Sequence, residues 1–191
     1  MKKPEFHFPP IFKKLKRGGP AIVLPKDIGM IIAYTGINRE SKVIEAGSGS
    51  GFLTVALAQV AKEVISYEIS SEFAKFAEDN IKRAGLDNAI VKNKDVLAGI
   101  DEEEVDAVVL DMKDAAKAVH IAHRSIKKDG ALVGYLPNIE QAKEFHIECE
   151  KVFGKAFMLE SIVREYEVRD FGVRPRHFGL MHTAYIIFAR K

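Results

Sequence analysis

The sequence predicts an α/β fold in which helices cover both faces of an open, seven-stranded, mostly parallel sheet that ends in an antiparallel hairpin. Three observations predict this fold. Short apolar runs alternate with segments of helical period. The runs are apolar almost throughout, as expected for strands that are buried on both faces. The last two runs are separated by a loop too short for a crossover helix, so we expect them to pair antiparallel.

Five short runs have the β-branched composition and the flanking Gly, Asp or Lys residues that are typical of strands. They are KVIEA (42–46), EVISYE (63–68), AIVKNKDV (89–96), VDAVVLD (105–111) and GALVGYLP (130–137). Two segments between them carry apolar residues at helical spacing, namely Phe73, Phe76, Ala77, Ile81 and Ala84, and Ile139, Ala142, Phe145, Cys149 and Val152. This alternation implies right-handed crossovers and places ligands at the carboxyl ends of the strands.

The two remaining apolar runs are MLESIVREYEV (158–168) and LMHTAYIIFARK (180–191), and we expect them to pair at one edge of the sheet. The chain opens with a stretch rich in Pro and Lys, which we interpret as a basic N-terminal extension over residues 1–24. A single domain then covers residues 25–191, since 191 residues with 47% hydrophobic content suit one core.

Composition and charge exclude several classes of protein. The formal net charge of +2 is only mildly basic, so a polyanionic partner would have to be held by local patches. The single cysteine, Cys149, allows no internal disulfide and no multi-thiolate metal site. No apolar run approaches the roughly 20 residues needed to cross a bilayer. We therefore expect a soluble, cytoplasmic protein without membrane contact and without a metal site.

Three glycines follow the first predicted strand and open a helix, where the backbone turns sharply and exposes N–H groups to a ligand. Gly47, Gly49 and Gly51 have the spacing G-x-G-x-G, which is tighter than the G-x-G-x-x-G of dinucleotide sites. The tighter loop suits a ligand that brings a carboxylate and an ammonium group. Glu68, after the second strand, can accept from both hydroxyls of a ribose, and Asp95, after the third, from an adenine amino group.

S-adenosylmethionine fits this description. NAD binding, or a glycine turn with two incidental surface carboxylates, are the alternatives that the pattern leaves open. The predicted cofactor-binding residues are Glu45, Gly47, Ser48, Gly49, Ser50, Gly51, Glu68 and Asp95.

Several longer motifs resemble one family. They are RGGPAIVLPKD (17–27), VIEAGSGSG (43–51), SYE (66–68), VLDM (109–112), GYLPN (134–138) and REYEVRDFGVRPRHFGLMHTAYIIFAR (164–190). With them the chain resembles the Rossmann-like class I methyltransferases that use S-adenosylmethionine, and among these the tRNA adenine-N1 methyltransferases that modify the T-loop. Many methyltransferases share the glycine loop, whereas PKD, YLPN and the C-terminal segment are much more specific.

The resemblance implies that the glycine loop, Glu68 and Asp95 hold the methyl donor, that Asp111 faces the target base, and that residues 135–138 line its pocket. It also implies a tRNA partner and a homo-oligomer, typically a tetramer. The chain departs from the family in two ways. Only about 16 residues precede Arg17, where relatives carry a small β-domain, so either the basic N-terminal stretch replaces it or substrate recognition differs. Lys113 stands where relatives often have Pro or Met.

The chemistry of methyl transfer points to Asp111 and Tyr135 as the catalytic residues. The donor is already activated, so the protein mainly aligns the reactants and excludes water. Alkylation at N1 makes adenine cationic, and Asp111 can accept from the N6 amino group and stabilise that charge. Tyr135 can stack on or border a base turned out of the RNA. The alternatives are an Asp that caps the next helix and a Tyr that only packs in the core.

Two basic clusters are candidates for contacting RNA phosphates: Lys13, Lys14, Lys16 and Arg17, and Arg164, Arg169, Arg174 and Arg176. His177 and His182 lack nearby carboxylate or thiolate spacing, so we interpret neither as a metal ligand. The predicted substrate-binding residues are Leu136, Pro137, Asn138, Arg164, Arg174 and His182. Two other functions stay open at this point: a small-molecule methyltransferase like those of corrinoid pathways, and a non-catalytic RNA-binding partner subunit.

Overall fold

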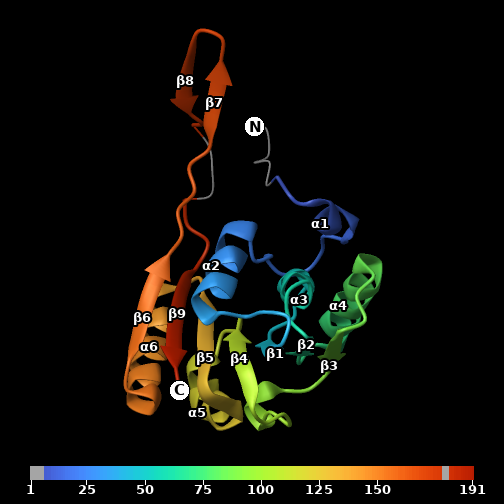
Figure 1. The fold of residues 1–191 in the computed structure, drawn as a ribbon, viewed down its shortest axis with the longest axis vertical. Helices are drawn as coiled ribbons and strands as arrows, with labels where there is room; N and C mark the ends of the chain where they lie inside the picture. The colour runs from blue at the N-terminus through green and yellow to red at the C-terminus, as the bar shows by residue number, and fades with distance from the viewer. Residues whose placement is uncertain (1–6, 178–180) are drawn as a thin grey trace.

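The computed structural model describes residues 7–177 and 181–191, and within them seven strands form one sheet in the order β3-β2-β1-β4-β5-β9-β6 (Figure 1). Neighbours from β3 to β5 are parallel, whereas β9 runs antiparallel to both β5 and β6. The predicted fold is therefore confirmed. The strands are β1 Lys42–Ala46, β2 Glu63–Tyr67, β3 Ala89–Lys92, β4 Val105–Leu110, β5 Ile126–Leu136, β6 Ala156–Glu160 and β9 Tyr185–Arg190.

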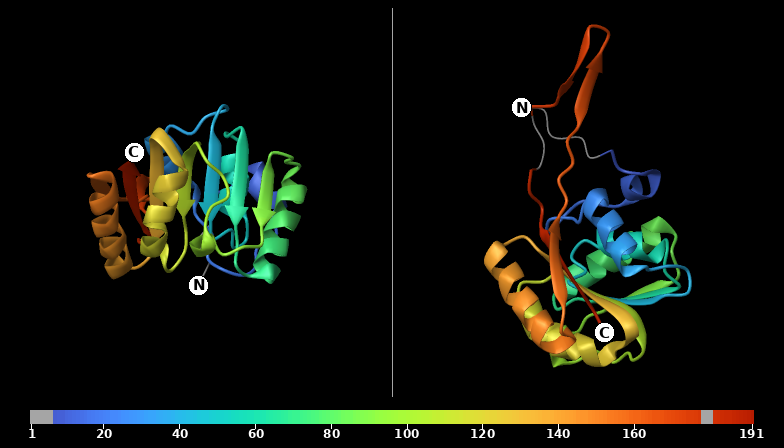
Figure 2. Two further views of the ribbon diagram at one scale, coloured as in Figure 1. Left: turned by 90° about the horizontal axis from the view of Figure 1, so that it is seen from below. Right: turned by 60° about the vertical axis from the view of Figure 1, so that its left-hand side comes forward.

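Helices cover both faces of the sheet, as the apolar strands require. Figure 2 shows α5 and α6 together on one side and α1 to α4 on the other. Each side has its own cluster of buried apolar residues. None of the helices in the described part of the chain is long and apolar enough to span a membrane. The helices are α1 Pro10–Lys14, α2 Pro25–Thr35, α3 Phe52–Ala58, α4 Ser71–Ala84, α5 Ala115–Ser125 and α6 Ile139–Phe153, with a 3-10 turn η1 Val96–Ala98.

The two helices predicted from apolar spacing are α4 and α6, and their ends have local causes. The Ser70 hydroxyl accepts from the Phe73 amide at the start of α4, and the Asn138 side chain accepts from the Glu140 amide at the start of α6. Each helix ends at a glycine with left-handed backbone, Gly85 and Gly154 respectively. Asn138 therefore has a structural role in addition to the substrate contact predicted for it.

Residues 7–24 pack on the body of the protein. Phe12, Leu15 and Val23 are buried in the core on the side of α1 to α4. The buried Asn80 of α4 holds this segment, because its side chain accepts from the Lys16 amide at 2.8 Å and donates to the Lys16 carbonyl at 3.0 Å. The domain boundary at Pro25 stays a prediction, but the structure shows that the preceding residues contribute to the core.

The C-terminal part contains a second hairpin that we did not predict. β6 pairs antiparallel with β9 as expected, but residues 161–165 leave the sheet and lead to β7 (Tyr166–Arg169), which pairs with β8 (Gly172–Pro175). This hairpin projects from the body (Figure 1). The predicted Gly/Arg/Pro loop is thus partly β-structure; Leu180, at the start of the last predicted strand, lies outside the described residues.

Candidate active site

A cavity of about 520 Å³ lies at the carboxyl ends of β1, β2 and β4. Of the predicted cofactor-binding and catalytic residues, those that line it are Glu45, Gly47, Ser48, Gly49, Ser50, Glu68, Asp95 and Asp111. Residues 20–23 also line it, together with Ile69, Phe73 and Leu97. No pattern in the sequence indicated this apolar part of the wall, except that residues 20–23 belong to one of the motifs that carry the family resemblance. Concave, mostly apolar sites with a few polar groups are typical of small-ligand sites.

Glycine is required at position 47 because β1 and β4 end close together there. A Cβ on Gly47 would lie 2.0 Å from the carbonyl oxygen of Asp111, and its φ of 93° is left-handed. Gly51 has a different role, since it does not line the cavity. Its Cβ would lie 3.0 Å from Cα of Ala77, so Gly51 lets α3 pack closely on α4.

The carboxylate of Glu68 lies beside the glycine loop. Its Oε2 accepts from the Gly49 amide and its Oε1 from the Ser70 amide, both at 2.9 Å. These two bonds hold the carboxylate at the end of β2, where a doubly hydroxylated sugar is recognised in folds of this type. Asp95 begins η1, and its Oδ1 accepts from the Leu97 amide at 2.8 Å.

Glu45, the acidic residue on β1, is fully buried and only half satisfied. Its Oε2 accepts from Thr54 Oγ1 at 2.5 Å and from Ser66 Oγ at 2.8 Å, whereas Oε1 has no partner among the described residues. Burial raises the pKa of Glu45 to about 8. Because Glu45 also lines the cavity, its unpartnered oxygen suits a polar group of a ligand.

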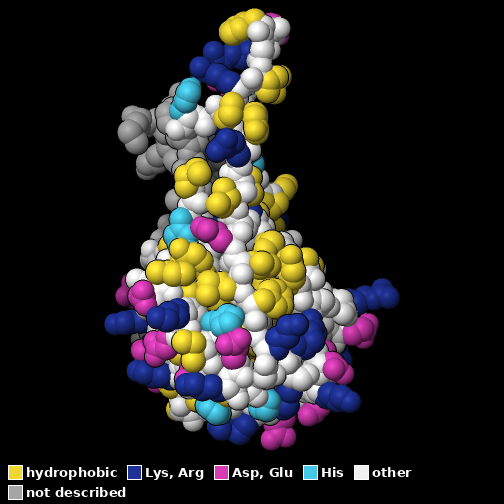
Figure 3. All heavy atoms as spheres, turned by 90° about the vertical axis from the view of Figure 1, so that its left-hand side faces the viewer, with side chains coloured by type: hydrophobic (Ala, Val, Ile, Leu, Met, Phe, Trp, Pro, Cys, Tyr) yellow, Lys and Arg dark blue, Asp and Glu magenta, His cyan; other side chains and the backbone are white. Residues whose placement is uncertain are grey.

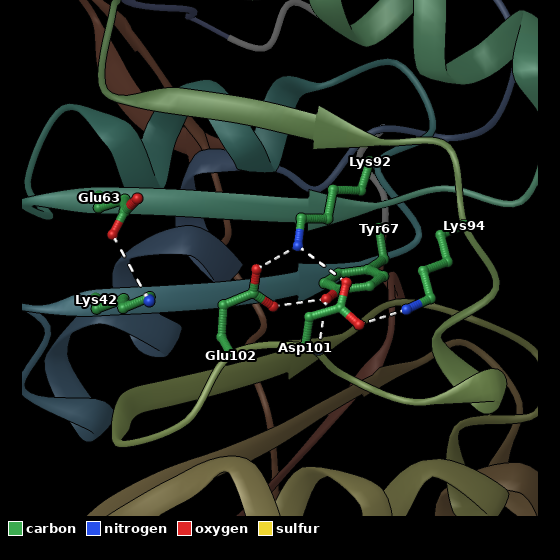
Figure 4. A network of polar contacts seen from close by, with 7 residues as sticks. All are labelled: Lys42, Glu63, Tyr67, Lys92, Lys94, Asp101 and Glu102. Carbon is green, nitrogen blue, oxygen red and sulfur yellow. Dashed lines mark hydrogen bonds and ion pairs between the residues drawn. The ribbon is translucent and has the colours of Figure 1, made fainter.

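A network of ion pairs and hydrogen bonds supports the wall of the cavity at Tyr67 and Lys94 (Figure 4). The Tyr67 hydroxyl donates to Glu102 Oε2 at 2.6 Å and accepts from the Asp101 amide at 3.0 Å. Lys92 Nζ contacts Glu102 Oε1 at 2.6 Å and Asp101 Oδ2 at 3.1 Å, and Lys94 pairs with Asp101. Tyr67 and Lys94 line the cavity, so the network fixes this wall to the loop before β4.

Asp111 follows β4 and faces the same cavity as the glycine loop. None of the described residues donates a hydrogen bond to its side chain. Burial, and then the charge of Glu68, raise the pKa of Asp111 to about 7. With Glu45 and Glu68 it gives the cavity three carboxyl groups, which suits a cationic ligand and a substrate that gains positive charge.

The structure places the remaining predicted residues away from the cavity lining. The buried Tyr135 donates its hydroxyl proton to Asp27 Oδ2 at 3.1 Å, and Leu136 is buried. Pro137 is exposed, and its carbonyl contacts His182 Nε2 at 2.9 Å, while His182 Nδ1 contacts Glu160 Oε1 at 2.6 Å.

The second basic cluster is partly neutralised. Arg169 and Arg174 both pair with Glu167, and Arg176 pairs with Glu165. Arg164 is exposed on the segment that leads to the hairpin. The charge that this cluster can offer to a phosphate backbone is therefore smaller than the count of arginines indicates.

The strand order reverses between β1 and β4, and the glycine loop and the acidic residue after β2 lie at that point, which is the ligand site of doubly wound folds. With the tight G-x-G-x-G spacing, this arrangement fits the class I S-adenosylmethionine-dependent methyltransferases. The family described as tRNA methyltransferase complex GCD14 subunit matches residues 18–182. This chain belongs to that family, and the resemblance inferred from its motifs is confirmed.

Known relatives agree with this assignment. TrmI of Methanocaldococcus jannaschii, a tRNA (adenine(57)-N(1)/adenine(58)-N(1))-methyltransferase, is 39% identical over 211 residues, which cover 94% of this chain and 74% of the relative. The crystal structure of the tRNA (m1A58) methyltransferase TrmI of Aquifex aeolicus is 29% identical with a TM-score of 0.88, covering 95% of this chain and 76% of that one. A Thermotoga maritima structure described as a SAM-dependent O-methyltransferase is 31% identical with a TM-score of 0.89, covering 96% and 71%.

Proposed function

We propose that this methyltransferase transfers a methyl group from S-adenosylmethionine to N1 of an adenine in the T-loop of tRNA. The observation that carries the proposal is the Asp111 carboxylate, which faces the cavity beside the glycine loop and lacks a donor among the described residues. An unpaired carboxylate at that place can accept from the N6 amino group of adenine. The family and the activity in the names of the relatives support the same substrate.

The donor site is built from the residues that line the cavity. When bound, S-adenosylmethionine supplies an activated methyl group on a sulfonium. Glu68 would hold its ribose hydroxyls and Asp95 its adenine amino group, whereas residues 47–50 would offer backbone amides to its carboxylate. Glu45, with one buried oxygen unpartnered, would take its ammonium group. The fit is good because each of these groups lies on one continuous wall of the cavity.

The acceptor side depends on Asp111. Its carboxylate accepts from N6–H of the target adenine and stabilises the positive charge that N1 alkylation places on the base. The raised pKa of Asp111, about 7, also lets the residue take a proton from N6 as the charge develops. The target base has to leave the RNA structure to reach this cavity, and residues 135–138 are the predicted border of its path.

The hairpin is the basis for proposing a homo-oligomer, in line with the tetramer implied by the resemblance. Tyr166 and Val168 of β7 lie on one face with Val173 and Pro175 of β8, since Tyr166 pairs with Pro175 and Val168 with Val173. This apolar face is exposed, with Val168 75% accessible. Figure 3 shows hydrophobic side chains along the hairpin and further ones on the body below it. A two-stranded hairpin is marginal by itself, so a second copy of the chain is the proposed cover.

The test is incubation with S-adenosylmethionine and an unmodified tRNA transcript, followed by nuclease digestion and mass spectrometry of the nucleosides. The proposal expects 1-methyladenosine from the wild type and a loss of at least about 100-fold for Asp111→Asn. The matched control is Asp79→Asn, on α4, which should keep the activity because Asp79 is exposed and does not line the cavity.

Two outcomes would contradict the proposal. Donor binding without any methylated nucleoside in tRNA would favour a small-molecule substrate. Absence of donor binding would favour a non-catalytic subunit. Calorimetric titration with S-adenosylmethionine separates these two outcomes. A cytoplasmic location belongs to the same proposal, because tRNA is the substrate.

A further inference from the structure

A buried polar cluster lies next to the cavity without lining it. Asp27, in the first turn of α2, is fully buried, and its Oδ1 accepts from Lys26 Nζ at 2.7 Å. Its Oδ2 accepts from Thr183 Oγ1 at 2.8 Å and from the Tyr135 hydroxyl at 3.1 Å. Lys26 Nζ also donates to Thr183 Oγ1 at 2.6 Å and to the Ser161 carbonyl at 2.7 Å.

A cluster of this kind is a weak source of stability. Burying charged groups is costly even when they are paired, and apolar residues often fill such a place equally well. The cluster has a larger effect on how parts of the chain are oriented relative to one another, because its hydrogen bonds connect segments that are far apart in the sequence. Lys26 and Asp27 of α2 are joined to Tyr135 at the end of β5, and to Ser161 and Thr183 in the two segments that connect the sheet with the hairpin.

Tyr135 connects this cluster with the reaction site. Leu110 of β4 is in register with Gly134 of β5, so the next residues, Asp111 and Tyr135, lie side by side at the ends of adjacent parallel strands. Burial and then the charges of Asp27 and Asp111 raise the pKa of Tyr135, so the phenol keeps its proton. The hydroxyl has only this one proton to donate, and its hydrogen bond goes to Asp27 and not to Asp111.

We propose that Asp27 is a positioning residue for methyl transfer. It accepts a hydrogen bond from the Tyr135 hydroxyl and so prevents this hydroxyl from donating to Asp111. The Asp111 carboxylate therefore stays available for the N6 amino group of the target adenine. The inference rests on the proposed function. It assigns a role to a buried carboxylate that neither binds the donor nor contacts the base. It also explains why the Tyr135 hydroxyl, on the strand next to Asp111, leaves that carboxylate without a donor.

The test is the pH dependence of kcat for Asp27→Leu with saturating tRNA, because asparagine would keep an oxygen that accepts from Tyr135. Without an acceptor at position 27, the Tyr135 hydroxyl is free to turn to Asp111. A hydrogen bond from Tyr135 to the ionised carboxylate would lower the pKa of Asp111. The acid limb of the profile of kcat against pH should therefore move to lower pH by about one unit. The plateau kcat should fall about tenfold, because the N6 amino group then competes with Tyr135, while the Kd for S-adenosylmethionine should not change.

Two further variants separate this effect from a loss of charge or of rigidity. The double variant Asp27→Leu/Tyr135→Phe lacks the hydroxyl, so its acid limb should return to the wild-type position. If the limb stays shifted, the removed charge and not the hydroxyl caused the shift, and the proposal is wrong. Thr183→Val loosens the same cluster but keeps the bond between Tyr135 and Asp27, so its limb should stay where it is. The carboxylates of Glu45 and Glu68, which face Asp111 from β1 and β2, are unchanged throughout.

If Asp27→Leu does not fold, the pH profile of Tyr135→Phe alone tests the proposal. The proposal expects the same acid limb as in the wild type, because the hydroxyl does not reach Asp111 in either protein. A limb that moves to higher pH would show that Tyr135 already donates to Asp111, and it would overturn the inference. Failure of the proposed function has a different signature, since the wild type would then form no 1-methyladenosine at all.

Discussion

Replacing Gly47 with alanine should displace Asp111 from its position in the cavity. The added Cβ would lie 2.0 Å from the carbonyl oxygen of Asp111, whereas such contacts essentially never fall below 3.0 Å, so the ends of β1 and β4 must separate by about 1 Å. The left-handed φ of 93° also becomes unfavourable for a residue with a side chain. Together, left-handed strain of about 1–2 kcal/mol and overpacking of about 1–3 kcal/mol should lower the free energy of unfolding by about 2–5 kcal/mol.

The effect on activity follows from the same displacement. A shift of about 1 Å in a group that aligns the substrate can lower kcat about 100-fold. Gly85→Ala is the matched control, because Gly85 has a similar φ of 74° and nothing lies within 4 Å of its would-be Cβ. This control should lose only the strain of about 1–2 kcal/mol and keep the wild-type kcat.

Urea unfolding and steady-state methylation of a tRNA transcript measure both effects. If Gly47→Ala matched Gly85→Ala in stability and kept the wild-type kcat, the close approach of β1 and β4 would not determine the position of Asp111. The reasoning about the site would then be refuted.

Other perturbations test separate parts of the account. The kcat of the wild type should rise with pH through about 7, because burial raises the pKa of Asp111 to that value and the ionised form is the one that accepts from N6; a flat pH–kcat profile would contradict this role. The pKa of Glu45 is raised to about 8 in the folded protein, so the folded state binds the proton more tightly than the unfolded chain does. The free energy of unfolding should therefore fall as the pH rises from about 5 to 8, and urea titrations should show a weaker fall for Glu45→Gln. Val168→Glu on the apolar face of the hairpin should shift the protein towards monomers in size-exclusion chromatography with light scattering, whereas Glu167→Gln on the opposite face should not.

The mostly parallel sheet and its antiparallel C-terminal pair could be predicted because burial leaves a periodic trace in the sequence. The core strands are apolar on both faces, and α4 and α6 carry one apolar stripe each. The position of Glu68 and Asp111 follows from the same logic, since both come directly after parallel strands, and the carboxyl ends of such strands meet at one edge.

The hairpin could not be separated from β6 in the sequence because β6 and β7 share one strand-like run, residues 158–168, with no Gly, Pro or Asn to mark a break. Tyr166 and Val168 alternate with Glu167 and Arg169, as in a strand that continues from residue 160, but residues 161–165 are extended and unpaired with the main sheet. Only the three-dimensional position of the segment distinguishes the two strands.

The contacts within the cluster around Asp27 could not be predicted either, although Asp27, Tyr135 and Thr183 all lie in motifs that resemble the family. Tyr135 and Thr183, which donate hydrogen bonds to Asp27, are 108 and 156 residues away from it in the sequence. No periodicity or short motif encodes contacts of that range. The same holds for Gly51, whose need for glycine comes from the approach of Ala77 and not from a ligand.

The central claim is that the cavity beside Asp111 accepts an adenine of the T-loop. The measurement that tests it most directly compares transfer of labelled methyl groups to two tRNA transcripts that differ only in their T-loop adenines. The account predicts that replacing these adenines with guanines abolishes incorporation, and that the unaltered transcript yields 1-methyladenosine. Equal incorporation into both transcripts would contradict it.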